Sequence, residues 1–140
     1  VLCLYDSMNY MRTSDDFGKA VREAASVLIE GGLFVFDICT IRNSELFFTD
    51  RSMVETFGDI TYKRICRYDR EERVQENHFI FERPDGKRLT ESHYQKIYFI
   101  DEIENMLKGT SFVELGRFDD MSFNFGSEQS ERVHFVLKKR

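Results

Sequence analysis

Two short apolar runs, separated by a helical pattern, constrain the fold of this 140-residue chain more than any other feature. The runs Val1–Tyr5 and Leu33–Phe36 are each closed by an aspartate, as is typical of strands buried on both faces of a parallel sheet. Between them, apolar residues recur from Phe17 to Leu28 at helical spacing, and Gly31-Gly32 favours a helix stop. This order predicts a right-handed βαβ unit with two parallel strands.

The apolar pattern changes to period two between about residues 53 and 99. Pro84 and Gly86 lie between two of the alternating segments and favour a tight reversal. This stretch therefore predicts an inserted antiparallel sheet with one solvated face.

The last forty residues return to the pattern of the first part. They predict a helix capped by Asp101 and ended by Gly109, followed by strands at Phe112–Leu115 and Val133–Leu137. We expect one partial α/β domain over residues 1–140, made of a βαβ core segment (1–52), the inserted sheet (53–99), and a helix with two core strands (100–140). Because a buried strand rarely opens a domain, Val1 is interpreted as an internal point of a longer protein.

Charge and cysteine content exclude several classes of function. Twenty Lys and Arg against 25 Asp and Glu leave a net charge of −5, which disfavours a general binder of nucleic acid or anionic membranes. No apolar run approaches the roughly 20 residues of a membrane span, and no secretory leader is expected. Cys3, Cys39 and Cys66 form no CxxC pair, which favours buried reduced thiols, a cytoplasmic setting and no metal site.

Several segments resemble, in the same order, the second half of a class I S-adenosylmethionine-dependent methyltransferase. They are the runs LCLYDSMNY (2–10) and GGLFVFD (31–37) with the helix between them, the run ESHYQKIY (91–98), and the closing ERVHFV (131–136). The resemblance implies a partial Rossmann-like sheet, with parallel strands and an antiparallel C-terminal strand, holding the family's strands 4, 5, 7 and 6. It also implies that the inserted sheet covers the substrate.

The glycines depart from the family pattern. None of the eight glycines has the Gly-x-Gly spacing with which the family's first half holds its cofactor. The resemblance therefore implies S-adenosylmethionine as the cofactor of the complete protein, with weak binding or none by this segment alone. We expect the isolated segment to be inactive.

Residues at the carboxyl ends of parallel strands face the crevice where ligands bind in open α/β sheets. Cys3, Leu4 and Tyr5 match family positions beside the methionine part and sulfonium of the cofactor, and Asn9 is predicted to bind the cofactor as well. The alternative is that Cys3 and Leu4 belong to the sheet core and that Asn9 forms a turn.

The candidate catalytic groups are His93 and Asp37. A histidine titrates near working pH and can act as a base on an acceptor, while a carboxylate at a strand end can accept a proton. Alternatively, His93 lies on a solvated strand face and Asp37 caps a turn. Tyr10, Thr40 and Tyr98 are predicted to bind the substrate, with core packing as the alternative for Tyr98.

The preferred function is methyl transfer from S-adenosylmethionine to a small-molecule acceptor, in which the protein mainly aligns the reactants. The alternative is a non-enzymatic α/β module that binds a protein partner, since a fold does not carry its function with it. An apolar edge strand is a template for pairing, so residues 1–5 predict a homodimer. The basic residues between 63 and 70 are interpreted as a charge-paired sheet face, and Phe118, Phe123 and Phe125 as an aromatic lid or a clamp on the inserted sheet.

Overall fold

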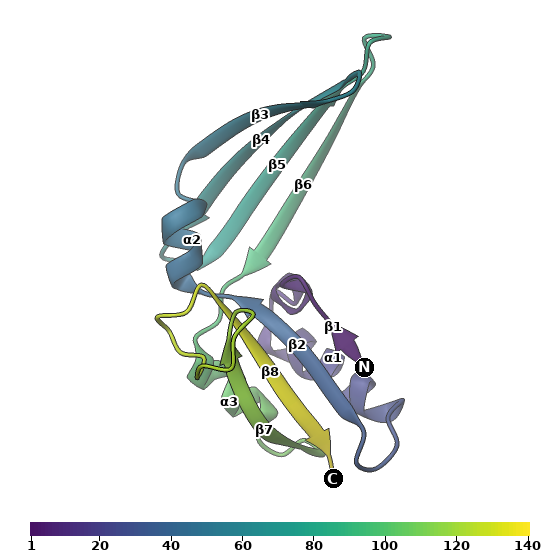
Figure 1. The fold of residues 1–140 in the computed structure, drawn as a ribbon, viewed down its shortest axis with the longest axis vertical. Helices are drawn as coiled ribbons and strands as arrows, with labels where there is room; N and C mark the ends of the chain where they lie inside the picture. Colours follow the sequence, from purple (N-terminus) through teal and green to yellow (C-terminus); the bar gives the residue numbers. More distant parts are fainter.

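The computed structural model describes residues 1–140, which form two four-stranded sheets and three α-helices (Figure 1). In chain order the elements are β1 (Leu2–Cys3), the 3-10 helix η1 (Ser7–Tyr10), α1 (Ser14–Ser26), β2 (Leu33–Cys39), α2 (Ile41–Phe47), β3 (Arg51–Phe57), β4 (Ile60–Asp69), β5 (Val74–Glu82), β6 (Arg88–Lys96), α3 (Ile100–Leu107), β7 (Phe112–Asp119) and β8 (Arg132–Lys139). None of the helices has both the length and the apolar character needed to cross a membrane.

The core sheet has the strand order β1-β2-β8-β7. β1 runs parallel to β2, whereas β8 lies between β2 and β7 and is antiparallel to both. The predicted α/β class, with parallel strands and an antiparallel C-terminal strand, is therefore confirmed. The order also agrees with the strands 4, 5, 7 and 6 that the resemblance implies.

Helices α1 and α3 lie behind the core sheet in Figure 1 and cover one of its faces. Phe17 and Val21 of α1 and Ile103 of α3 are fully buried against the apolar residues of β2 and β8. The rings of Phe36 and Phe135 stack with centroids 5.0 Å apart, and Phe17 meets Phe36 edge-on at 5.8 Å. Such aromatic pairs add to the free energy gained from burial alone. The helical stripe and the strand Leu33–Phe36 thus meet in one core.

The start of α3 differs from the prediction that Asp101 caps it. The helix begins at Ile100, and the backbone N–H of Phe99 donates to the carboxylate of Glu102 at 2.8 Å. Glu102 is held in this position by a bidentate ion pair with Arg73 of the loop after β4. This tertiary contact, which the local pattern does not contain, explains the shift.

The first apolar run is not the strand buried on both faces that its composition predicts. β1 has only two residues, and the side chains of Leu2 and Tyr5 are 70% and 85% exposed. Tyr5 and Asp6 have φ angles of 59° and 49°, in the left-handed region, which ends the extended backbone. The expectation of burial is therefore wrong for this structure. β1 does lie at the edge of the core sheet, as predicted for residues 1–5, with β2 as its hydrogen-bonded neighbour.

The inserted sheet extends away from the core sheet (Figure 1) and has the order β3-β4-β5-β6, with every pair antiparallel. The second, antiparallel sheet predicted from the alternating pattern is confirmed, although β3 starts at Arg51. Because alternate residues of a strand share a face, one face is largely apolar and aromatic and the other is polar. The apolar face carries Met53, Phe57, Ile60, Tyr62, Arg64, Phe79, Phe81, Leu89 and His93.

Candidate functional site

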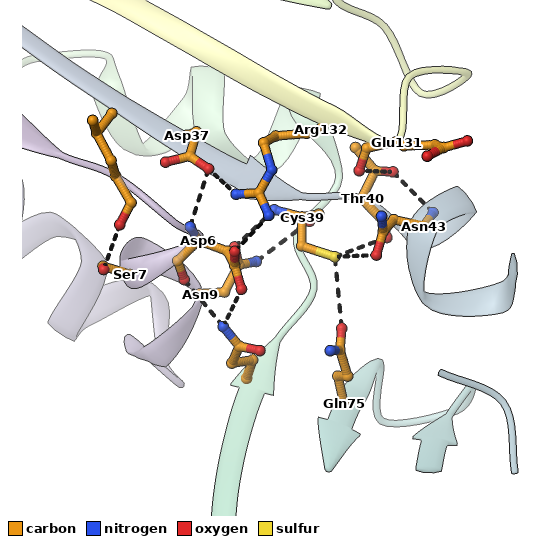
Figure 2. Close-up of polar contacts among 12 residues, drawn as sticks. Asp6, Ser7, Asn9, Asp37, Cys39, Thr40, Asn43, Gln75, Glu131 and Arg132 are labelled. Atoms are coloured by element: carbon orange, nitrogen blue, oxygen red, sulfur yellow. Dashed lines mark hydrogen bonds and ion pairs between the residues drawn. The ribbon is translucent and has the colours of Figure 1, made fainter. Parts of the chain in front are cut away.

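A network of charged side chains lies at the carboxyl ends of β1 and β2 (Figure 2). Arg132, the first residue of β8, forms ion pairs with both Asp6 and Asp37, with 2.7 Å between its Nη2 and Asp6 Oδ1. The backbone N–H of Asp6 donates to Asp37 Oδ2 at 3.1 Å. Gln95 of β6 donates from Nε2 to Asp6 Oδ2 at 2.6 Å, which links the inserted sheet to the network. The chain thus joins its two sheets through charge-assisted hydrogen bonds.

Arg132 keeps its charge in this environment. Burial acts to lower the pKa of Arg132, but its hydrogen bonds to Asp6 and Asp37 outweigh burial and raise the pKa above its ordinary value. Asp37 is only 1% exposed, and its Oδ1 atom has no hydrogen-bond donor. Two carboxylates and one guanidinium leave the network with one net negative charge.

Three of the predicted binding residues make their hydrogen bonds to the protein's own backbone. The side-chain amide of Asn9 donates to Lys96 O at 2.8 Å, and its carbonyl accepts from the N–H of Cys39 at 3.0 Å. The hydroxyl of Thr40 donates to Ser130 O at 2.6 Å and caps α2. The hydroxyl of Tyr98 likewise donates to a backbone carbonyl, at 2.6 Å, from within the core.

A hollow of about 250 Å³ lies between the turn after β1 and the inserted sheet, and we call it the histidine hollow. Its lining includes Tyr5, Tyr10, Arg64, Phe79, Glu91 and His93. Tyr10 Oη and His93 Nδ1 are 2.7 Å apart, and His93 Nε2 lies 3.5 Å from a carboxylate oxygen of Glu91. Both ring nitrogens of the histidine thus have a polar neighbour.

The phenol of Tyr10 is held neutral. Burial, followed by the charge of Asp6, raises the pKa of Tyr10 above its ordinary value. In the tautomer with the proton on Nδ1, the His93 ring donates to the oxygen of this neutral phenol, which orients the ring and leaves the lone pair of Nε2 free. The arrangement suits a histidine that accepts a proton from a bound molecule.

A second hollow, of about 360 Å³, is called here the aspartate hollow. It is lined by Leu4 and Tyr5 after β1, by Asp37 of β2, by Asp120 and Met121 of the loop after β7, and by Arg132 and His134 of β8. Asp37 and His134 are directly opposite each other on neighbouring strands, and His134 Nδ1, like Asp37 Oδ1, has no hydrogen-bond partner. Because Tyr5 lines both hollows, they adjoin at the turn after β1.

The structure brings together five of the nine predicted site residues. Tyr5, Tyr10 and His93 line the histidine hollow, and Leu4, Tyr5 and Asp37 line the aspartate hollow. The four that line neither hollow are Cys3, Asn9, Thr40 and Tyr98. For Asn9, Thr40 and Tyr98 the physical reason is that their polar atoms bond to the backbone, whereas Cys3 packs against the core.

Two other groups of predictions can be placed. Phe118, Phe123 and Phe125 line neither hollow, and Phe123 packs edge-on against Phe118. All three cysteines are free, and burial raises the pKa of the Cys39 thiol to about 12, so that this thiol is neutral. The structure holds no group of three or more side chains suited to a metal ion.

The sequence did not predict that Arg132 and Gln95 belong to the site. It also did not predict that Arg64 and Lys63 lie on opposite faces of their strand. A basic residue at the start of the apolar strand Val133–Leu137 was a usable signal for Arg132, but its partners are far away in the sequence. For Arg64, the signal was period two: it shares a face with Tyr62, while Lys63 lies on the opposite face.

Comparison with known proteins finds that the chain is similar to methyltransferases. No family model matches it. It is 28% identical to the putative methyltransferase YqeM of Bacillus subtilis and 30% identical to the putative methyltransferase GWCH70_2453 of Geobacillus sp.. These matches cover 99% and 96% of this chain, but 57% and 56% of the relatives, so the chain spans a little over half of their length.

A solved structure gives the same result. The S-adenosylmethionine-dependent methyltransferase of Clostridium acetobutylicum superposes with a TM-score of 0.82 at 26% sequence identity, over 99% of this chain and 56% of that protein. The resemblance to the C-terminal half of a class I S-adenosylmethionine-dependent methyltransferase is therefore confirmed in sequence and in fold.

Proposed function

We propose that this chain supplies the acceptor side of a methyltransferase site, which transfers a methyl group from S-adenosylmethionine to a small molecule. The observation that carries the proposal is the position of Tyr5. It was predicted to lie beside the cofactor, and it lines a hollow together with Tyr10 and His93, which were predicted to serve the acceptor. Cofactor and acceptor groups would then meet at one turn of the chain.

The aspartate hollow fits the cationic part of such a cofactor. S-Adenosylmethionine, when bound, supplies a methyl group on a positively charged sulfur. The network of Asp6, Asp37 and Arg132 carries one net negative charge, and Asp37 Oδ1 has no donor of its own. These residues would hold a cation through that carboxylate oxygen, since a buried carboxylate lacking a donor favours a positively charged or hydrogen-bonding partner.

His93 is the proposed base. Its Nε2 atom would take the proton that an amine or hydroxyl acceptor gives up on methylation, and Glu91, 3.5 Å from Nε2, would stabilise the resulting imidazolium. Tyr10 orients the ring through the 2.7 Å contact with Nδ1. Asp37 is already held by Arg132 and by the backbone of Asp6, so we assign it to binding rather than to proton transfer.

The 140 residues by themselves should bind the cofactor weakly and be inactive, because their glycines lack the Gly-x-Gly spacing. The test is a titration of the ¹⁵N-labelled chain with S-adenosylhomocysteine, followed by NMR. We expect small, fast-exchange shifts confined to the amides of Leu4, Tyr5, Asp6 and Asp37. Shifts elsewhere would contradict the assignment of the site, and a low-micromolar dissociation constant would contradict weak binding.

The coding sequence upstream of Val1 separates the enzyme from a non-enzymatic interaction module. An apolar strand followed by an acidic-x-Gly-x-Gly segment, some 100 residues before Val1, would support the enzyme. A natural chain that begins near Val1 would favour the module. The exposed apolar side chains of Phe57, Ile60 and Leu89 on the inserted sheet are the surface through which such a module would bind its partner.

We further infer that two copies pair through the edge strand β1 in a reducing, cytoplasmic setting. β1 has one free hydrogen-bonding edge, and the Leu2 side chain is exposed beside it. Light scattering should show a dimer that Leu2→Lys converts to a monomer. A monomeric parent chain would refute the pairing.

A further inference from the structure

Arg64 of β4 is a cation beside the histidine hollow that forms no ion pair. Arg64 has no carboxylate oxygen within 4.0 Å, whereas Arg73, Arg117 and Arg132 each form an ion pair. The nearby carboxylates are engaged elsewhere, since Asp6 pairs with Arg132 and Glu91 lies against His93. The positive charge of Arg64 is therefore available to a ligand.

The guanidinium of Arg64 is held in place on three sides. Its Nε and Nη2 atoms donate to Asn77 Oδ1 at 3.1 and 2.8 Å. The rings of Phe48 and Phe79 have their centroids 5.0 and 5.4 Å from its Cζ atom, within the range of cation–π attraction. An arginine has five N–H donors, so the two that bond to Asn77 and the one that contacts the Cys66 thiol leave two for a ligand. A restrained guanidinium with free donors is organised in advance for a planar anionic group, because little side-chain entropy is lost on binding.

Flat apolar surface lies between Arg64 and His93. The strand register aligns Arg64 of β4 with Phe79 of β5, and Asn77 of β5 with His93 of β6. The rings of Phe79 and Phe81 are nearly parallel, with 11° between their planes, and both line the hollow. The Phe79 ring lies between the two side chains, with its centroid 5.4 Å from Arg64 Cζ and 5.5 Å from the centroid of the His93 ring, so a flat ligand placed against Phe79 can reach both.

We propose that the histidine hollow binds a small planar molecule that carries a carboxylate or phosphate group, with the anion on Arg64 and the ring against Phe79. That this molecule is the methyl acceptor, with its nucleophilic atom toward His93, rests on the proposed function. The binding itself does not, because it requires only the residues of the hollow.

The test is calorimetry and NMR on the whole chain, with 4-aminobenzoate, phenyl phosphate, the neutral 4-aminobenzamide and acetate as probes. At least one of the two planar anions should bind about tenfold or more tightly than 4-aminobenzamide. Acetate should bind more weakly than that anion. Arg64→Gln should weaken the preferred anion by about tenfold or more. Arg64→Lys should lose part of the affinity, because it keeps the charge but not the fork of donors.

Arg67→Gln is the matched control, since Arg67 lies on the same strand but on the opposite, exposed face. It should leave binding unchanged. Circular dichroism checks that each variant folds. If Arg64→Gln does not fold, the affinity of Arg64→Lys for the planar anion is the test. A preference for 4-aminobenzoate identifies a carboxylate ligand, and one for phenyl phosphate identifies a phosphate.

Other outcomes would overturn the proposal. The first is that 4-aminobenzamide or acetate binds as tightly as the preferred planar anion. The second is that neither planar anion binds, and the third is that the Arg64 and Arg67 variants lose the same affinity for the anion. The result is separable from the proposed function: an anion that binds at Arg64, in a protein without the upstream cofactor segment, would support the ligand site and contradict the methyltransferase. The reverse pattern would retain the methyltransferase and reject the ligand site.

Discussion

Replacement of Arg132 by methionine should destabilise the chain more than any surface substitution. Arg132 is the shared partner of Asp6 and Asp37, which lie 126 and 95 residues away in the sequence. Methionine retains most of the side chain's apolar volume but removes the charge and all donors. The buried carboxylate of Asp37 is then left with only the Asp6 backbone N–H.

The magnitude follows from the burial of the partners. Loss of one member of a buried ion pair costs about 3–5 kcal/mol when the other charge stays buried. Asp37 is 1% exposed, but the side chains of Arg132 and Asp6 are 26% and 20% exposed, so solvent screens part of the network. We therefore expect a loss of about 2–4 kcal/mol in the free energy of unfolding. Total stability for a chain of this length is about 7–20 kcal/mol, so the loss is measurable.

Urea unfolding, followed by circular dichroism, measures the effect. With a slope of about 2 kcal/mol per molar, the midpoint should fall by about 1–2 M. Arg70→Met is the control, because Arg70 forms an exposed pair with Glu45 and should cost about 0.5 kcal/mol or less. Adding Asp37→Asn to the Arg132 variant should recover about 1 kcal/mol, since the uncompensated charge disappears. A loss equal to that of the Arg70 control, or no recovery in the double variant, would refute the reasoning.

Three further predictions concern single side chains. Hydrogen bonds from Arg73 hold the pKa of Glu102 below its ordinary value of 4.5 despite burial, so this carboxylate stabilises the fold above that pH and the contribution is lost as pH falls through the folded pKa. Thermal unfolding of Glu102→Gln should accordingly depend less on acid than that of the parent. Burial raises the pKa of Tyr98 from 10 to about 12, so its contribution is complete below pH 10 and disappears between pH 10 and 12; alkaline titration of Tyr98→Phe should show a flatter stability profile. Asn9→Ala should cost about 2–3 kcal/mol in urea unfolding, because the N–H of Cys39 loses its acceptor inside the protein; a loss near zero would show that water replaces the amide.

Elements that depend on local pattern were predictable. The apolar stripe of α1 places Phe17 and Val21 in the core, and the glycine pair that follows includes Gly31 with a φ of 77°, a conformation that other residues avoid. The strands of the core sheet coincide with continuous apolar runs, and those of the inserted sheet coincide with segments in which apolar and polar residues alternate. The parallel pairing of β1 and β2 follows from the helix between them.

The candidate site was predictable only in part. Residues at the end of a strand, such as Leu4, Tyr5 and Asp37, could be located because strand ends meet at one edge of a sheet. The contact of Tyr10 with His93, 83 residues apart, could be anticipated only through the resemblance. Nothing near Asn9 in the sequence shows that its amide bridges Lys96 and Cys39.

By itself, then, the sequence determined most of the helices, strands and turns, because those choices depend on neighbours within about ten residues, but it did not predict α2 or the shortness of β1. Only the tertiary structure decided which polar groups are free to act. The register that places Asp37 opposite His134, and Arg64 in line with Phe79, sets which side chains share a face, and a shift of one residue would turn each to the other face. Chemistry at this site therefore rests on pairings between strands distant in the chain.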